Sequence, residues 1–244
     1  MKRLCKLILP LLIAVVLPLG VSAAHGVDSA LVAKAHLAMQ QHQWVNAQAL
    51  YLLLEDKNPD YAEAYTGHIV ASEMRGQSDF AVETLERAIS AGVAPDSILN
   101  PFRSAVRALG QPHLYPQLLQ QAAQKLPYMS RVFDARLLDY YSFRRNSTAT
   151  IEYARKLLAG LPTDTRFLLT LAQAEMDAGN MGAATDAWER VLAADPSNFD
   201  ALIALGNYLV LNKEGSKARP YLQRAYSIKP TPYVARLLKQ IPEV

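Results

Sequence analysis

The stretch Thr165–Asn198 reads TRFLLTLAQAEMDAGNMGAATDAWERVLAADPSN and divides into two amphipathic segments joined by a short break. In the first segment, Leu168, Leu171 and Ala172 follow the three- and four-residue spacing of one helix face. The break Asp-Ala-Gly-Asn ends that helix, because Gly and Asn are common where helices terminate. A second apolar stripe follows and stops at Pro196, since proline cannot continue a helix. The stretch therefore predicts a helix–turn–helix unit.

The same pattern recurs along the chain with a nearly constant period. The prolines that end successive stretches are separated by 36, 32, 35, 34 and 34 residues: Pro59, Pro95, Pro127, Pro162, Pro196 and Pro230. The spacing predicts six units, over about 28–61, 62–96, 97–130, 131–164, 165–198 and 199–232. One more amphipathic helix is expected over 233–241, where it would cap the open apolar end of a stack of repeats.

Small residues recur inside the units where two helices are expected to approach closely. They are Ala35, Ala47, Ala81, Ala184, Gly206 and Ala218. The third and fourth units depart from this pattern. Ser104 and Pro116 occupy the small positions of the third, and Leu138 and Thr150 those of the fourth. These two units are assigned mainly from their length.

This arrangement resembles the tetratricopeptide repeat, a helix–turn–helix of about 34 residues. The resemblance implies an all-α fold, an α-solenoid of about six units with a C-terminal capping helix. It also implies a non-catalytic protein whose first helices line a concave groove. The usual ligand of such a groove is an extended peptide or a helix of another protein.

Projecting the groove face onto this sequence gives twelve candidate partner-binding residues: His36, Met39, Glu73, Met74, Phe102, Arg136, Asp139, Phe143, Gln173, Met176, Asn207 and Leu211. Their Met and Phe side chains suggest an apolar, adaptable groove. The alternative is that half of them pack against neighbouring helices. The Lys, Arg and Asn cluster with which chaperone-binding members hold a terminal carboxylate is not matched, since only Asn207 and Arg136 lie on suitable faces.

The N-terminus predicts export. Lys2, Arg3 and Lys6 precede a 13-residue apolar run, and small residues follow it, as in a secretory signal peptide over 1–24 cleaved near Ala23 or Ala24. The run is shorter than a spanning helix, so no stable membrane insertion is expected after cleavage, although a retained anchor is the alternative. The one cysteine precedes the run, which argues against a lipoprotein.

Removal of these residues changes the composition. The chain has 25 basic and 22 acidic residues and a net charge of +3, and the signal contains three of the basic residues and the cysteine. The remainder is charge-balanced, so a nucleic-acid partner is not expected, nor is a disulfide. The five histidines never fall four apart on one helix, and no nucleophile or phosphate-loop motif occurs. We expect no metal, no cofactor and no enzyme activity.

Two functions fit these observations. The first is a periplasmic scaffold or adaptor that binds a peptide or helix of a partner in an envelope assembly or secretion system. The alternative is a carrier or chaperone associated with polysaccharide or murein in a biosynthesis or export complex, which requires exposed aromatic side chains along the groove.

Overall fold

The computed structural model describes residues 26–241, and over this range it contains helices and no strand. The predicted signal peptide, 1–24, lies outside the described residues. The helices are α1 (Ser29–Gln40), α2 (Trp44–Lys57), α3 (Ala62–Met74), α4 (Ser78–Ser90), α5 (Pro95–Ala108), α6 (Leu114–Lys125), α7 (Ser130–Phe143), α8 (Ser147–Gly160), α9 (Thr165–Asp177), α10 (Met181–Ala194), α11 (Phe199–Leu211), α12 (Gly215–Ile228) and α13 (Pro232–Lys239). A single turn of 3₁₀ helix, Pro127–Met129, precedes α7.

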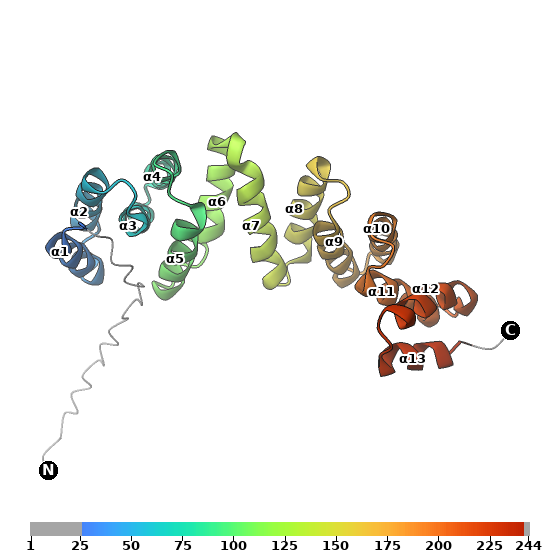
Figure 1. Cartoon of the computed structure of the whole chain (residues 1–244). Helices are drawn as coiled ribbons and strands as arrows, with labels where there is room; N and C mark the ends of the chain where they lie inside the picture. Colours follow the sequence, from blue (N-terminus) through green and yellow to red (C-terminus); the bar gives the residue numbers. More distant parts are fainter. Residues whose placement is uncertain (1–25, 242–244) are drawn as a thin grey trace, which may run out of the picture. The chain divides into compact units, whose positions relative to one another are not determined.

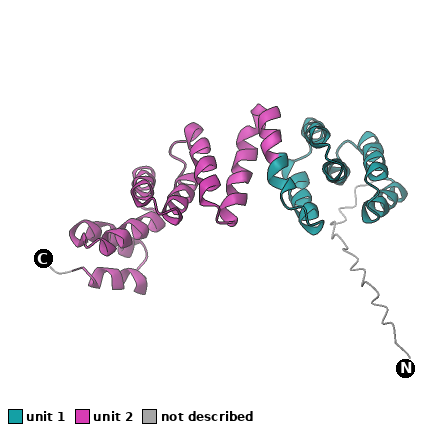
Figure 2. Ribbon diagram, turned by 180° about the vertical axis from the view of Figure 1, so that it is seen from behind, with its two compact units in different colours: residues 1–118 teal, residues 119–244 magenta. Residues whose placement is uncertain are grey.

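The chain forms two compact units, which divide within α6 after Leu118 (Figure 2). In unit 1, which ends there, α1 packs on α2, α2 on α3, and α3 on both α4 and α5. In unit 2, which begins at Leu119, each helix from α7 to α12 packs on the next, and α13 packs on α12 and α11 (Figure 1). These helix pairs and the final helix confirm the predicted α-solenoid of about six units with a C-terminal capping helix.

The period is visible in the backbone of the turns. One residue in the turn inside each helix pair has a left-handed conformation, and these residues follow one another at 34, 34, 35, 34 and 34: His42, Gly76, Gly110, Arg145, Gly179 and Lys213. Only three of them are glycine, the residue that adopts this conformation without steric cost. In the other three, a side chain is held at a cost of about 1–2 kcal/mol, so the turn geometry is kept even where the sequence does not favour it.

Counting from these turns corrects the sequence assignment of the third unit. The residue five positions after the turn is Ala47, Ala81, Ala184 or Ala218 in four pairs, and each is fully buried. In the third pair that position is Tyr115, not Pro116, and the small position on the first helix is Arg103, not Ser104. Tyr115 packs against Phe102 with ring centroids 6.3 Å apart. Large side chains therefore replace the close helix approach in this pair.

Two glycines inside helices allow close packing. A Cβ added at Gly206 of α11 would lie 2.6–2.7 Å from Leu222 carbons of α12. A Cβ added at Gly67 of α3 would lie 2.2–2.5 Å from the ring of Tyr51, a buried residue of α2. The sequence analysis found the first of these close contacts. It missed the second because Gly67 lies two residues before the small position of its repeat.

Gly67→Ala should therefore destabilise unit 1 by about 1–3 kcal/mol, because the rigid Tyr51 ring must move out of a filled site. Gly182→Ala is the matched control. It lies in α10 with nothing within 4 Å of the added Cβ, and alanine there should stabilise the helix by about 0.5–1 kcal/mol. Urea unfolding followed by circular dichroism measures both. Equal stability of the two variants would contradict the packing of Tyr51 on Gly67.

Candidate functional site

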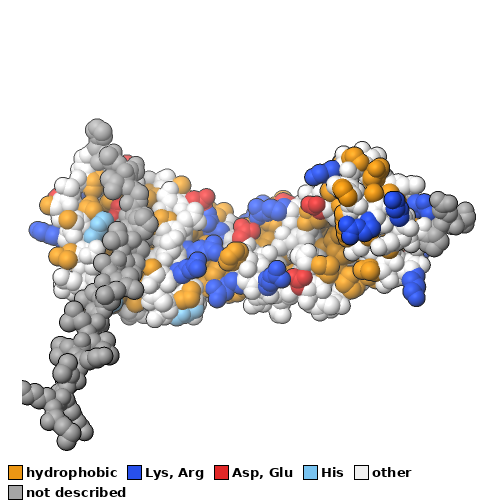
Figure 3. Space-filling model, turned by 90° about the horizontal axis from the view of Figure 1, so that it is seen from below, with side chains coloured by type: hydrophobic (Ala, Val, Ile, Leu, Met, Phe, Trp, Pro, Cys, Tyr) orange, Lys and Arg blue, Asp and Glu red, His pale blue; other side chains and the backbone are white. Residues whose placement is uncertain are grey.

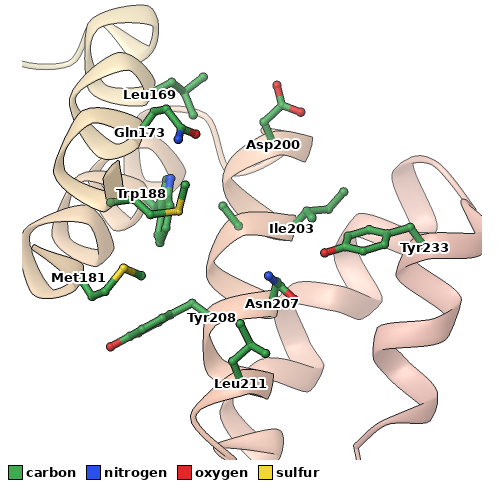
Figure 4. Close-up of a pocket in the computed structure, with 12 residues that line it drawn as sticks. Leu169, Gln173, Met181, Trp188, Asp200, Ile203, Asn207, Tyr208, Leu211 and Tyr233 are labelled. Carbon is green, nitrogen blue, oxygen red and sulfur yellow. The ribbon is translucent and has the colours of Figure 1, made fainter. Parts of the chain in front are cut away.

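A hollow of about 520 Å³ lies in unit 2, between the first helices of two successive pairs and the capping helix (Figure 4). Helices α9, α10, α11 and α13 contribute its walls. The lining residues are Leu169, Gln173, Met176, Met181, Trp188, Asp200, Ile203, Ala204, Asn207, Tyr208, Leu211 and Tyr233. We call this hollow the C-terminal groove.

The repeat places equivalent residues side by side in this groove. Leu169 and Ile203 are 34 residues apart, as are Gln173 and Asn207, so each pair occupies one position on two successive first helices. Side-chain caps fix where these helices begin. The carboxylate of Asp164 accepts hydrogen bonds from the backbone at the start of α9, and the side chain of Asn198 does so for α11.

The capping helix closes the far side. Thr231 caps its first turn and Pro232 is its first residue, a position where a missing N–H costs nothing. The next residue, Tyr233, is 43% exposed, and its hydroxyl points toward α11 between Ile203 and Asn207 (Figure 4). Removing α13 would therefore open the groove on one side.

The chemistry of the groove is apolar with a few polar groups. Most of the lining is aliphatic, thioether or aromatic, and the side-chain amides of Gln173 and Asn207 lie among these groups. The Gln173 Nε2 donates to the Asp177 Oδ1 at 2.7 Å, which orients that amide. Such a lining can hold apolar side chains of a ligand, while the amides can bond to peptide N–H and C=O groups.

The structure brings four of the twelve predicted residues together: Gln173, Met176, Asn207 and Leu211 all line the C-terminal groove. Three others lie on α7 of the same unit but outside this lining. Of these, Phe143 is 79% exposed, Asp139 is exposed and Arg136 is half-buried. Burial lowers the pKa of the Arg136 guanidinium, and Asp139 opposes that shift.

Two of the five predictions in unit 1 are wrong because the side chains are buried. Phe102 is fully buried and packs on Tyr115. Glu73 is only 5% exposed, and its Oε2 accepts a hydrogen bond from Ser78 Oγ at 2.9 Å. Neither side chain can contact a partner. The periodic pattern marks the inward faces of α3 and α5 as readily as the groove face, which is the reason for the error.

The remaining three residues of unit 1 make internal contacts. His36 Nε2 pairs with the carboxylate of Glu63 across α1 and α3, and Met39 packs on the apolar cluster around Tyr51. Met74 is partly buried at the end of α3. Burial alone would raise the pKa of Glu63, but its contacts with His36 and Tyr61 outweigh burial and hold that pKa below its usual value.

Sequence reasoning missed several lining residues. Trp188 was assigned to the repeat core, and it is 5% exposed, yet it also lines the groove. Tyr208 adjoins the predicted Asn207 but does not match the spacing used for the projection. Tyr233 was assigned only to the cap. A signal for it exists, because Tyr233 follows the aromatic Phe199 by one full period of 34 residues.

Unit 1 also contains a buried polar network outside any groove. Glu55 lies between His68 Nδ1, at 2.7 Å, and the Arg87 guanidinium, at 2.8 Å, and so joins α2, α3 and α4. Over residues 26–241, no three His, Cys, Asp or Glu side chains gather in a way that could hold a metal ion. No helix in that range is both long and apolar enough to cross a membrane.

Comparison with known proteins agrees with this architecture. The tetratricopeptide repeat family model matches residues 169–233, which contain nearly all of the groove lining. A repeat-containing protein from Cytophaga hutchinsonii is 18% identical, with 80% of this chain and 77% of that chain covered and a TM-score of 0.48. A double mutant of MamA from RS-1 is 15% identical, with 70% and 95% covered and a TM-score of 0.49. No curated protein sequence matches the chain.

The chain is a tetratricopeptide repeat protein. Its fold is that of a protein–protein interaction scaffold, and the family is typically non-catalytic.

The burial of Glu73 predicts a pH dependence. Burial raises the pKa of its carboxyl above the usual 4.5, while Ser78 and His113 oppose the shift. An acid with a raised pKa in the folded state holds its proton more tightly there, so the free energy of unfolding should fall as pH rises above about 4.5. Glu73→Gln should flatten that fall in urea titrations at several pH values, with exposed Glu83→Gln as the control. An unchanged slope in Glu73→Gln would contradict it.

Proposed function

We propose that this protein is a non-catalytic scaffold or adaptor that binds a peptide or helix of a partner protein in the C-terminal groove. The observation that carries the proposal is the groove itself. Two successive first helices present matched apolar and amide side chains, and the capping helix adds Tyr233 to the same surface. A volume of about 520 Å³ is within the range of sites that hold several side chains of a ligand.

The exposure of apolar groups supports a ligand of this kind. Leu211 is 72% exposed and Met176 is 37% exposed, and both border the hollow. On the face seen in Figure 3, acidic and basic side chains are interspersed, and hydrophobic side chains gather toward the C-terminal end of the chain. Exposed apolar groups beside a concave site are typical of surfaces that bind another protein.

The polysaccharide alternative has less support in this groove. Sugars stack on exposed aromatic ring faces, and the largest ring of the lining, Trp188, is 5% exposed. Tyr233 is 43% exposed, while aliphatic and thioether groups make up about half of the lining. These groups suit the apolar side chains of a peptide better than a polymer of hydroxyl groups.

We also propose that the protein acts in the periplasm, in an envelope assembly or secretion system. Support for this location comes from the N-terminal residues, where a basic segment, an apolar run and small residues follow in the order of a signal peptide. The partner is then another exported protein or the periplasmic part of a membrane protein.

The binding proposal is tested by capturing partners from a periplasmic extract. The double variant Met176→Glu with Leu211→Glu places two charges at the groove and should weaken capture at least about tenfold, which corresponds to 1.4 kcal/mol. The matched control is Tyr226→Glu with Ile228→Glu, which adds the same charges at exposed apolar positions of α12. Equal loss in both variants, or retention on murein or polysaccharide without a protein, would contradict the proposal.

The location is tested separately. Cells expressing the tagged chain should release it on osmotic shock, and mass spectrometry should find a mature N-terminus at Ala24 or His25. A chain that keeps Met1 and stays in the cytoplasmic fraction would overturn the periplasmic assignment. That result would leave the groove proposal intact.

A further inference from the structure

A second hollow in unit 2 adjoins the C-terminal groove. It has a volume of about 540 Å³ and is formed by α10, α11 and α12. Tyr208 lines both hollows, so its side chain separates two recesses on one stretch of α11. In Figure 4 the Tyr208 ring extends from α11 toward Met181 of α10.

The charges that line the two hollows are mostly negative. Asp200 is the one charged residue in the lining of the C-terminal groove. The second hollow has three carboxylates and one ammonium group, and these belong to Asp186, Glu189, Glu214 and Lys217. Lys217 Nζ lies 2.5 Å from Glu214 Oε2, so this pair is internally balanced. The other three carboxylates leave the surface around Tyr208 with an excess of negative charge.

Nearby basic side chains do not offset this excess within the lining. Arg224 of α12 donates to the backbone carbonyl of Pro196, and Lys229 lies over the Phe199 ring with its Nζ 5.8 Å from the centroid. Neither residue lines either hollow. The acidic groups are therefore the charges that a ligand in these hollows meets first.

We infer that the partner segment is a basic, apolar peptide that crosses α11 at Tyr208. An apolar side chain of the peptide occupies the C-terminal groove, and Lys or Arg side chains face Asp200 on one side and Asp186 and Glu189 on the other. Opposite charges across an interface favour encounter and fix the register of the bound segment. This inference rests on the proposed function and adds the chemical class of its ligand.

The test uses synthetic peptides and an intrinsic reporter. The chain has two tryptophans, so the full chain with Trp44→Phe leaves Trp188, in the groove lining, as the one source of indole emission. It is titrated with a peptide of alternating leucine and lysine, and with counterparts in which glutamine or glutamate replaces lysine. Anisotropy of the labelled peptide gives the affinity, and Trp188 emission reports occupation of the groove.

The lysine peptide should bind and shift the Trp188 emission, the glutamine peptide should bind about tenfold more weakly, and the glutamate peptide should not bind. Added salt should weaken the lysine peptide. Asp200→Lys with Glu189→Lys should weaken it at least about tenfold, a change of 1.4 kcal/mol, and should allow the glutamate peptide to bind. The matched control is Glu83→Lys with Glu86→Lys, which reverses two exposed charges on α4 and should leave all affinities unchanged.

Other outcomes separate the two proposals. If the glutamine and lysine peptides bind equally and charge reversal has no effect, the inference is overturned and the proposed apolar groove stands. If the α4 control weakens binding as much as the groove variant, attraction to overall charge explains the result and the inference is again overturned. If no peptide shifts the Trp188 emission while circular dichroism shows intact folding of each variant, both proposals fail.

Discussion

The close approach of paired helices at small residues is the contact on which the rest of this structure depends. Ala47, Ala81, Ala184 and Ala218 are fully buried five residues after their turns, and Gly206 and Gly67 admit neighbouring side chains where a Cβ would clash. Dispersion and burial reward such contacts only at short range. Because each pair packs in the same way, each next pair starts from a similar position. The groove in unit 2 is a consequence of this regularity.

The fold could be predicted from sequence because its signals are local and repeated. Apolar spacing, terminating prolines and small residues recur with one period, and errors at single positions do not change it. Ser104 and Pro116 illustrate this, because both were assigned one residue away from the true small positions without affecting the helix pair. Gly67 was missed because the pattern asks for a small residue two positions later.

The candidate site was less predictable, and particular residues show why. Gln173 and Asn207 were identified because they share one position in two regular repeats. Phe102 has a comparable pattern, but it lies in the repeat with Tyr115 at the small position, where a large ring must be buried. Tyr233 and Trp188 were assigned to other roles. Amphipathic spacing states which face of a helix is apolar, but tertiary packing decides whether that face meets another helix or solvent.

The order of helix packing has a consequence for how the chain folds. Within each unit, the helices that pack together are adjacent in sequence or separated by one helix. Contacts of this kind need little loop closure, so chains dominated by them fold rapidly. Folding can begin at any pair and spread to its neighbours, and an end helix such as α13 is held from one side alone. The capping helix that completes the groove is thus expected to open before the interior pairs, and hydrogen exchange at its amides would be the fastest among the groove helices.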